Sequence, residues 1–101
     1  MYLTDFAMES KIEIIQINIS GEDKPGMTSS LTDILARYDA FILDIGQANI
    51  HQSLTLGILF MTTSDKSGAI LKELLFKASE LGVMIRFTPI AERKYEDWVG
   101  R

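Results

Sequence analysis

The chain has 101 residues, of which 47% are hydrophobic, and this is enough for one domain with a modest core. Its net charge of −4 argues against nucleic-acid binding, because phosphate contacts dominate that affinity. The absence of cysteine excludes disulfide frameworks and thiolate metal sites, and no apolar run approaches the roughly 20 residues that cross a bilayer. Residues 1–10 lack the pattern of a signal peptide, so we expect a cytoplasmic protein with neither nucleic-acid nor membrane partners.

The first predicted elements are a strand over residues 11–20 and a helix over residues 27–38. Isoleucines recur at every second position of the strand, and apolar residues repeat at helical spacing in the helix. Hydroxyl side chains at positions 28–30 can satisfy free backbone N–H groups at the start of this helix. Asp39 is expected to end it, because aspartate tolerates the left-handed backbone conformation.

A hairpin is predicted next, with strands over residues 41–50 and 54–62 joined by a turn at 51–53. Gly46 is expected to mark a bulge or a close approach in the first of these strands. The second strand carries apolar residues on both of its faces, which is typical of a strand covered on both sides.

A second helix is predicted over residues 66–81 and a last strand over residues 83–90. Ser64 or Asp65 can cap the start of the helix, and Gly82 stands where a glycine commonly ends one. The apolar stripe expected to face the core is Ile70, Leu71, Leu74, Leu75, Ala78 and Leu81.

The element order β-α-β-β-α-β predicts an α+β fold, a ferredoxin-like sandwich. In this fold two helices cover one face of a four-stranded antiparallel sheet, and the first and third strands are central. The other face would be bare, and exposed apolar area of that kind usually marks an interface. The apolar residues expected on the bare face are Ile42, Leu59, Met61 and Met84.

The turn between the first strand and the first helix is the most informative candidate site. Free backbone N–H groups at a helix start suit a carboxylate, and the carboxylate of Asp23 suits an amino group. Pro25 stiffens the turn, and Gly26 lets a ligand approach the backbone. Together these groups suit a small zwitterion. The alternative is a plain turn in which Asp23 bonds its own backbone. The spacing matches no phosphate-binding loop.

Other polar residues carry weaker signals for chemistry. His51 is the single histidine, and in a predicted turn it is best interpreted as an exposed polar residue. Asp44 is either a ligand or interface residue or an edge-strand residue that faces water. Tyr95 and Trp98 either cover a patch of a partner domain or belong to a linker. No nucleophile–base or carboxylate pair occurs at motif spacing, so we expect no catalysis by this chain.

Three blocks of sequence resemble a known family. Residues 19–28 resemble the G-x-D-x-P-G motif that opens many ACT domains. Residues 43–51 with 54–59, and residues 83–90 with 95–101, closely resemble the amino-terminal ACT domain of the long bacterial phosphoserine phosphatases. The resemblance covers roughly residues 12–101, which is nearly the whole chain.

The resemblance implies a partner, a ligand and a parent enzyme. ACT domains pair and bind amino acids at the pairing interface, so a homodimer or a pair with a second ACT domain is expected, with L-serine as a plausible ligand. The parent would be a haloacid-dehalogenase-type phosphatase, and its Mg²⁺ would belong to a catalytic domain absent from this chain, which itself needs no cofactor or metal. The residues assigned to ligand binding are Asp23, Lys24, Pro25, Gly26, Met27 and Thr28.

The chain departs from the family pattern at three positions. Gly21 stands where some serine-binding relatives carry histidine, Phe41 where many ACT domains carry asparagine, and Asp39 where glycine is common. Two hypotheses follow, an amino-acid-sensing regulatory domain and a dimerisation module that needs no ligand. In either case the expected organisation is a leader at 1–10, an ACT domain at 11–91 and a linker or tail at 92–101.

Overall fold

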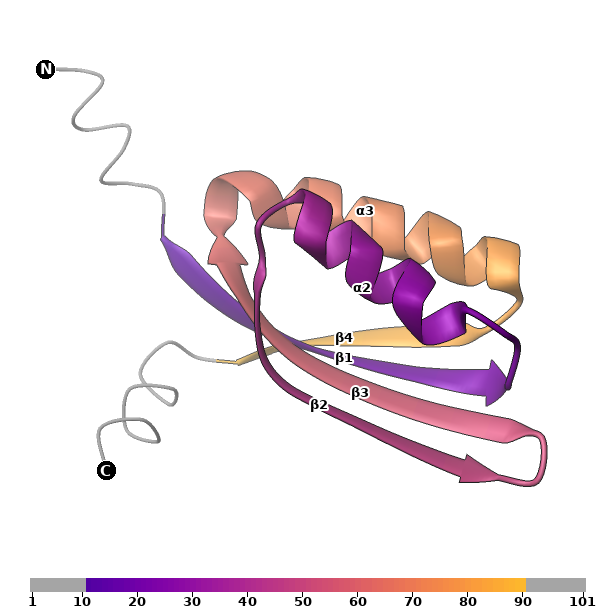
Figure 1. The fold of residues 1–101 in the computed structure, drawn as a ribbon. Helices are drawn as coiled ribbons and strands as arrows, with labels where there is room; N and C mark the ends of the chain where they lie inside the picture. Colours follow the sequence, from indigo (N-terminus) through magenta and orange to yellow (C-terminus); the bar gives the residue numbers. More distant parts are fainter. Residues whose placement is uncertain (1–10, 91–101) are drawn as a thin grey trace, which may run out of the picture.

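The computed structural model describes residues 11–90, in which a four-stranded sheet carries two helices on one face (Figure 1). Neighbouring strands are antiparallel, and the strand order is β2-β3-β1-β4. This confirms the predicted ferredoxin-like fold, with the first and third strands in the centre. The predicted leader, the tail and its aromatic residues Tyr95 and Trp98 lie outside the described residues. The elements are β1 (Ile12–Glu22), α2 (Met27–Arg37), β2 (Phe41–Ile50), β3 (Ser53–Thr63), α3 (Ser64–Leu81) and β4 (Met84–Ile90).

The hydrophobic core lies between the helices and the two central strands. In β1, Ile15, Ile17 and Ile19 face the helices, as the alternation of the sequence predicts. Fully burying one such side chain stabilises the fold by about 1.5–3 kcal/mol relative to leaving it exposed. Neither helix of the described chain combines the length and hydrophobicity that crossing a membrane requires. The core is completed from β3 and the helices by Met27, Leu31, Ile34, Leu35, Leu54, Leu56, Ile58, Phe60, Ile70 and Leu74.

Strand β2 contains a bulge, but not at the predicted glycine. Ile42 pairs with Phe60 and Asp44 with Leu59, so Leu43 is the extra residue. Gly46 pairs regularly with its neighbour strand, and a Cβ there would meet open space. The bulge reverses which alternate positions face the helices. For this reason Ile42 packs against the core, and its expected place on the bare face was wrong.

Helix α3 begins two residues earlier than predicted and has no side-chain cap. The hydroxyl of Ser64 instead accepts a hydrogen bond of 3.0 Å from the backbone amide of Lys11. Leu75, expected in the core, is 54% exposed. The predictions for the C-terminal ends of α2 and α3 are confirmed. Asp39 and Gly82, which follow these helices, adopt left-handed conformations with φ of 58° and 73°.

A small polar cluster joins the two helices on their outer side. Arg37 of α2 donates to Glu73 of α3 at 2.9 Å, and the hydroxyl of Tyr38 donates to the same carboxylate. The Tyr38 hydrogen bond, followed by Arg37, lowers the pKa of Glu73 below its ordinary value. The same hydrogen bond to the carboxylate raises the pKa of Tyr38. The cluster therefore favours the charged form of Glu73 in the folded state.

The close approach of β1 to the start of β4 yields a first prediction. A Cβ on Gly21 would lie 2.7 Å from Cγ1, 3.0 Å from Cβ and 3.2 Å from Cα of Val83. Gly21→Ala should therefore lower the free energy of unfolding by about 1–3 kcal/mol in urea denaturation. The control Gly46→Ala adds its methyl group to open space and should change stability little. Equal losses in the two variants would contradict this account.

The helix-joining cluster yields a prediction about acid. Because the pKa of Glu73 is lowered in the folded state, its contribution to stability is present above the unfolded value of about 4.3 and is lost as pH falls through the folded pKa. Glu73→Gln removes this proton-linked contribution, so its unfolding midpoint should fall less steeply below about pH 5 than that of the wild type. The control is Glu80→Gln, which leaves the Tyr38–Glu73 contact intact and should keep the wild-type slope. A slope unaltered by Glu73→Gln would refute the assignment.

Candidate functional site

The turn after β1 lies at the same end of the sheet as the β2–β3 hairpin (Figure 1). The backbone amide of Asp23 donates to the carbonyl of Gln52 at 2.8 Å, which joins the turn to the tip of the hairpin. Gly26 has a left-handed φ of 76° and immediately precedes α2, so the chain reverses sharply there. The turn residues from Asp23 to Gly26 are exposed. The predicted candidate site is therefore accessible and held against a second element.

A chain of side-chain hydrogen bonds crosses from the turn to β2. The amide nitrogen of Asn49 donates to the Asp23 carboxylate at 2.8 Å, and the amide nitrogen of Gln47 donates to the side-chain oxygen of Asn49 at 3.0 Å. The hydroxyl of Thr28 donates to the side-chain oxygen of Gln47 at 3.0 Å. The Asp23 carboxylate thus accepts from Asn49, unlike the plain-turn alternative in which it bonds its own backbone.

Two backbone amides in the first turn of α2 are open, whereas that of Met27 donates to the carbonyl of Lys24 at 3.2 Å. The hydroxyl of Ser29 donates to the carbonyl of Gly26 at 3.1 Å, and that of Thr28 donates to Gln47, so neither hydroxyl caps the helix. The expectation that these hydroxyls satisfy the free amides was wrong. Within residues 11–90 the backbone amides of Thr28 and Ser29 have no acceptor. The helix N-terminus therefore presents unsatisfied donors and partial positive charge.

Lys24 and Met27 have structural contacts beside the site. The ammonium of Lys24 donates to the carbonyl of Leu81 at 2.7 Å, close to the C-terminal end of α3, where cations are favoured. The side chain of Met27 is buried in the core, so only its backbone can face a ligand. Ligand binding by these two residues stays a prediction. The open groups of the site are the Asp23 carboxylate and the backbone amides of Thr28 and Ser29.

The two open groups are complementary to the two charged ends of an amino acid. The helix N-terminus favours a carboxylate, and the carboxylate of Asp23 favours an ammonium group. Because Asp23 accepts just one hydrogen bond of those described, from Asn49, its remaining lone pairs can accept others. No group of three or more potential metal ligands occurs among the described residues. The arrangement suits binding of a small zwitterion.

The remaining sequence candidates do not join this site. His51 is exposed in the hairpin turn with φ of 57°, as an exposed polar turn residue would be. Asp44 is exposed on the edge strand, and one of its oxygens accepts from the backbone amide of Ile45 at 2.9 Å. Sequence reasoning missed Gln47 and Asn49. Both residues are on the side of β2 that faces the helices, as Ile45 is. This orientation could not be predicted without knowing of the bulge at Leu43.

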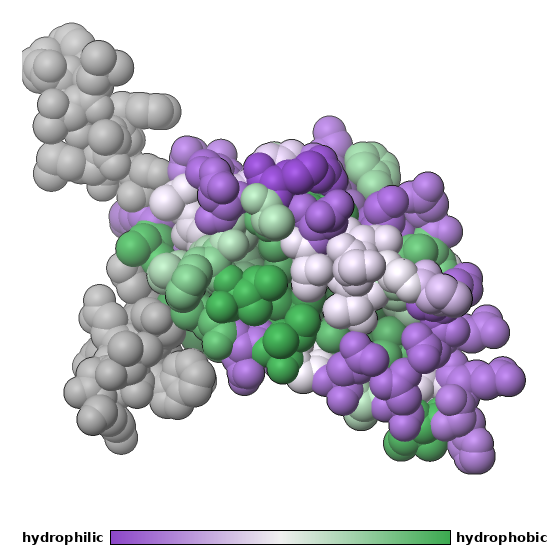
Figure 2. Space-filling model, in the orientation of Figure 1, coloured by the Kyte–Doolittle hydropathy of each residue, from purple (hydrophilic) through white to green (hydrophobic). Residues whose placement is uncertain are grey.

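The edge strand β2 carries three large apolar side chains that are exposed. Phe41 is 60% exposed, Ile45 is 45% exposed and Ile50 is 70% exposed. Figure 2 shows hydrophobic side chains gathered beside the first half of β2, in contrast to the hydrophilic outer side of the helices. One side of β2 pairs with β3, and its other side has no strand partner in the described sheet. This edge can pair with another chain.

Comparisons with known proteins point to one family. The family model described as "ACT domain" matches residues 13–88. Phosphoserine phosphatase SerB2 of Mycobacterium tuberculosis is 38% identical over 52 residues, which cover 52% of this chain and 12% of that protein. The chain thus spans a small part of the curated relative that it matches.

Solved structures share the fold. An ACT domain protein from Streptococcus pneumoniae superposes with a TM-score of 0.65 at 20% identity, covering 76% of this chain and 89% of that one. Formyltetrahydrofolate deformylase from Burkholderia mallei superposes with a TM-score of 0.67 at 11% identity, covering 75% of this chain and 28% of that one. At these identities the similarity shows the fold alone.

Proposed function

The chain belongs to the ACT domain family, and we propose that it is a regulatory domain that binds a small amino acid, with L-serine as the first candidate. The similarity to a phosphoserine phosphatase supports serine, which is the product of phosphoserine hydrolysis. In this proposal the phosphatase activity, its haloacid-dehalogenase-type chemistry and its Mg²⁺ belong to a separate catalytic domain, and this chain supplies regulation in the cytoplasm.

The observation that carries the proposal is the uncapped first turn of α2, which is joined to the Asp23 carboxylate through the side chains of Gln47 and Asn49. A helix start that is satisfied by its own side chains would compete with a ligand, but here the two hydroxyls of Thr28 and Ser29 are turned to other acceptors. The ligand carboxylate would accept from the amides of residues 28 and 29, and its ammonium would donate to Asp23. Ligand binding would explain why the turn keeps a carboxylate at Asp23 and two open amides at the helix start, neither of which a plain turn needs.

Ligand binding is tested by thermal unfolding of this chain with each of the twenty amino acids. L-Serine at ten times its Kd should add about 1.4 kcal/mol of stability and raise the Tm by several degrees. Asp23→Asn should remove most of this increase, because the ammonium loses its charged acceptor. Asp33→Asn, which makes the same charge change at an exposed position of α2, is the control and should retain it.

The outcomes of this experiment separate the two hypotheses. If another small amino acid stabilises the wild type but not Asp23→Asn, the proposed site is correct and that amino acid, not serine, is its ligand. A folded dimer that responds to none of the twenty amino acids would refute sensing by this chain and leave the ligand-independent pairing module. Turnover of phosphoserine by the purified chain would contradict a purely regulatory role.

Pairing with a second ACT domain is a second proposed function, and β2 favours it. The strand is one of the two edges of the sheet and bears large exposed apolar side chains, a combination that is an aggregation risk unless a partner covers it. A second copy could extend the sheet through antiparallel main-chain hydrogen bonds along β2. Gln47 and Asn49 lie on the same strand, so this edge is adjacent to the proposed ligand site.

Pairing along β2 is tested with two matched phenylalanines. Phe41→Lys places a charge at the start of β2 and should shift sedimentation equilibrium toward monomer, by at least about tenfold in the dimer dissociation constant. Phe76→Lys makes the same change on α3, where the side chain is 65% exposed against 60% for Phe41. The control should dimerise like the wild type. Equal weakening by both variants, or a monomeric wild type, would contradict pairing at this edge.

A further inference from the structure

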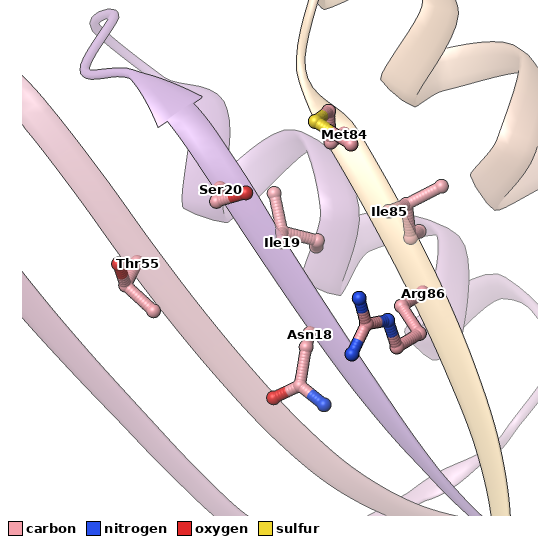
Figure 3. A pocket seen from close by; sticks show the side chains of 7 residues that line it. All are labelled: Asn18, Ile19, Ser20, Thr55, Met84, Ile85 and Arg86. Atoms are coloured by element: carbon pink, nitrogen blue, oxygen red, sulfur yellow. The ribbon is translucent and has the colours of Figure 1, made fainter.

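The face of the sheet that carries no helix contains a hollow whose lining is partly apolar and partly polar. It has a volume of about 270 Å³ and lies over β3, β1 and β4. Figure 3 views this face, with the helices behind the sheet, and shows the Arg86 guanidinium turned from β4 toward Asn18 on β1. The hollow is on the opposite side of the sheet from the helices and is distinct from the Asp23 turn. The residues that line it are Asn18, Ile19, Ser20, Thr55, Met84, Ile85 and Arg86.

The polar groups of this hollow are hydrogen-bond donors without a carboxylate among them. Arg86 contributes the positive charge, Asn18 an amide, and Ser20 and Thr55 hydroxyls. In the register of the sheet Asn18 is opposite Arg86 and Ser20 is opposite Thr55, so the four groups form two cross-strand pairs, two positions apart along β1, on one face. A planar guanidinium flanked by hydroxyl and amide donors is the arrangement that recognises carboxylate and phosphate oxygens.

The charge of Arg86 is not used within the described structure. In residues 11–90 its guanidinium forms neither an ion pair nor a hydrogen bond, whereas Arg37 pairs with Glu73 at 2.9 Å. The acidic residues of the same face stand apart from it. Glu22 is two positions beyond Ser20 on β1, and Asp44 is on β2, the far edge of the sheet. A basic donor is thus left open in a protein of net charge −4.

The floor of the hollow is a buried strand, and the position on β3 beside Asn18 carries no side chain. Ile19, which alternates with the donors on β1, is 1% exposed in the core and fixes the strand from behind. Gly57 pairs with Asn18 and has no side chain to cover it, since a Cβ there would come within 3.6 Å of the Asn18 oxygen. Asn18, Ser20 and Thr55 project from the central strands β1 and β3, so these three side chains lose little freedom on binding.

We propose that this hollow is a second ligand site, which binds a small oxyanion, a carboxylate or phosphate group, through Arg86 with Asn18, Ser20 and Thr55. The site lies on the opposite face from the amino-acid site and does not depend on it. Met84, which is 75% exposed, forms an apolar wall that would cover the carbon skeleton of an organic anion. Binding here would give the domain a response to anions that is separate from its response to a zwitterion.

The test is a titration of the ¹⁵N-labelled chain with sodium phosphate and, separately, sodium acetate, at constant ionic strength against sodium chloride. Saturable shifts are expected for the amides of Asn18, Ser20, Thr55 and Arg86. Arg86→Gln should raise the fitted Kd at least about tenfold, because a charged hydrogen bond is lost. Arg86→Lys keeps the charge and should recover part of the affinity. Tighter binding of phosphate or of acetate identifies the preferred oxyanion group.

Two controls make the result decisive. Lys72→Gln removes a charge from the exposed side of α3 and should leave the Kd unchanged. Asp23→Asn should also leave these shifts unchanged, so a failure of the amino-acid site does not affect this test. Unsaturable shifts, shifts confined to residues 27–29, or equal affinity in wild type and Arg86→Gln with a well-dispersed spectrum would overturn the proposal.

Discussion

The burial of β1 between β3 and β4, beneath both helices, is the constraint on which the rest of the structure depends. Its helix-facing isoleucines are almost fully buried, and its backbone pairs on both sides along most of its length. A strand in this position cannot shift by one residue without exchanging its buried and exposed faces. Every element that contacts β1 therefore inherits a fixed register, including the turn that follows it. The close approach of Val83 to Gly21 sets the separation of β1 and β4 where that turn begins.

This constraint holds the proposed amino-acid site in a formed state. The turn is bonded to three places: the Asp23 amide to the hairpin, the Asp23 carboxylate to Asn49, and the Lys24 ammonium to the end of α3. Each contact is to a segment far away in the sequence, so a movement of the turn away from β2 and α3 would break these hydrogen bonds. A ligand that binds here meets donors and acceptors already in place, and this reduces the entropy that binding must lose. The same contacts connect occupancy of the turn to the hairpin and to the end of α3.

The fold was predictable from the sequence, because alternation in the strands and spacing in the helices reflect one shared core. The site was predictable in part. Asp23, Pro25 and Gly26 stand in a turn whose residue types carry their own signal, whereas Gln47 and Asn49 do not. Their orientation depends on the bulge at Leu43, which no glycine marks. The role of Gly21 could not be predicted from the local sequence either, because it depends on a contact with Val83, 62 positions away in the chain. The same close contact leaves no room at this position for a larger residue such as histidine.

The location of Gln47 and Asn49 gives the two proposed functions a common physical basis. Both residues are on the edge strand β2, and their side chains form part of the hydrogen-bond chain that ends at the Asp23 carboxylate. A partner strand paired along β2 would restrict the backbone from which these amides project. A ligand at the turn would in turn restrict the amides themselves. Two events that order the same residues are coupled in free energy, and the coupling is equal in both directions. Pairing along β2 should therefore strengthen amino-acid binding, and a bound amino acid should strengthen pairing by the same factor.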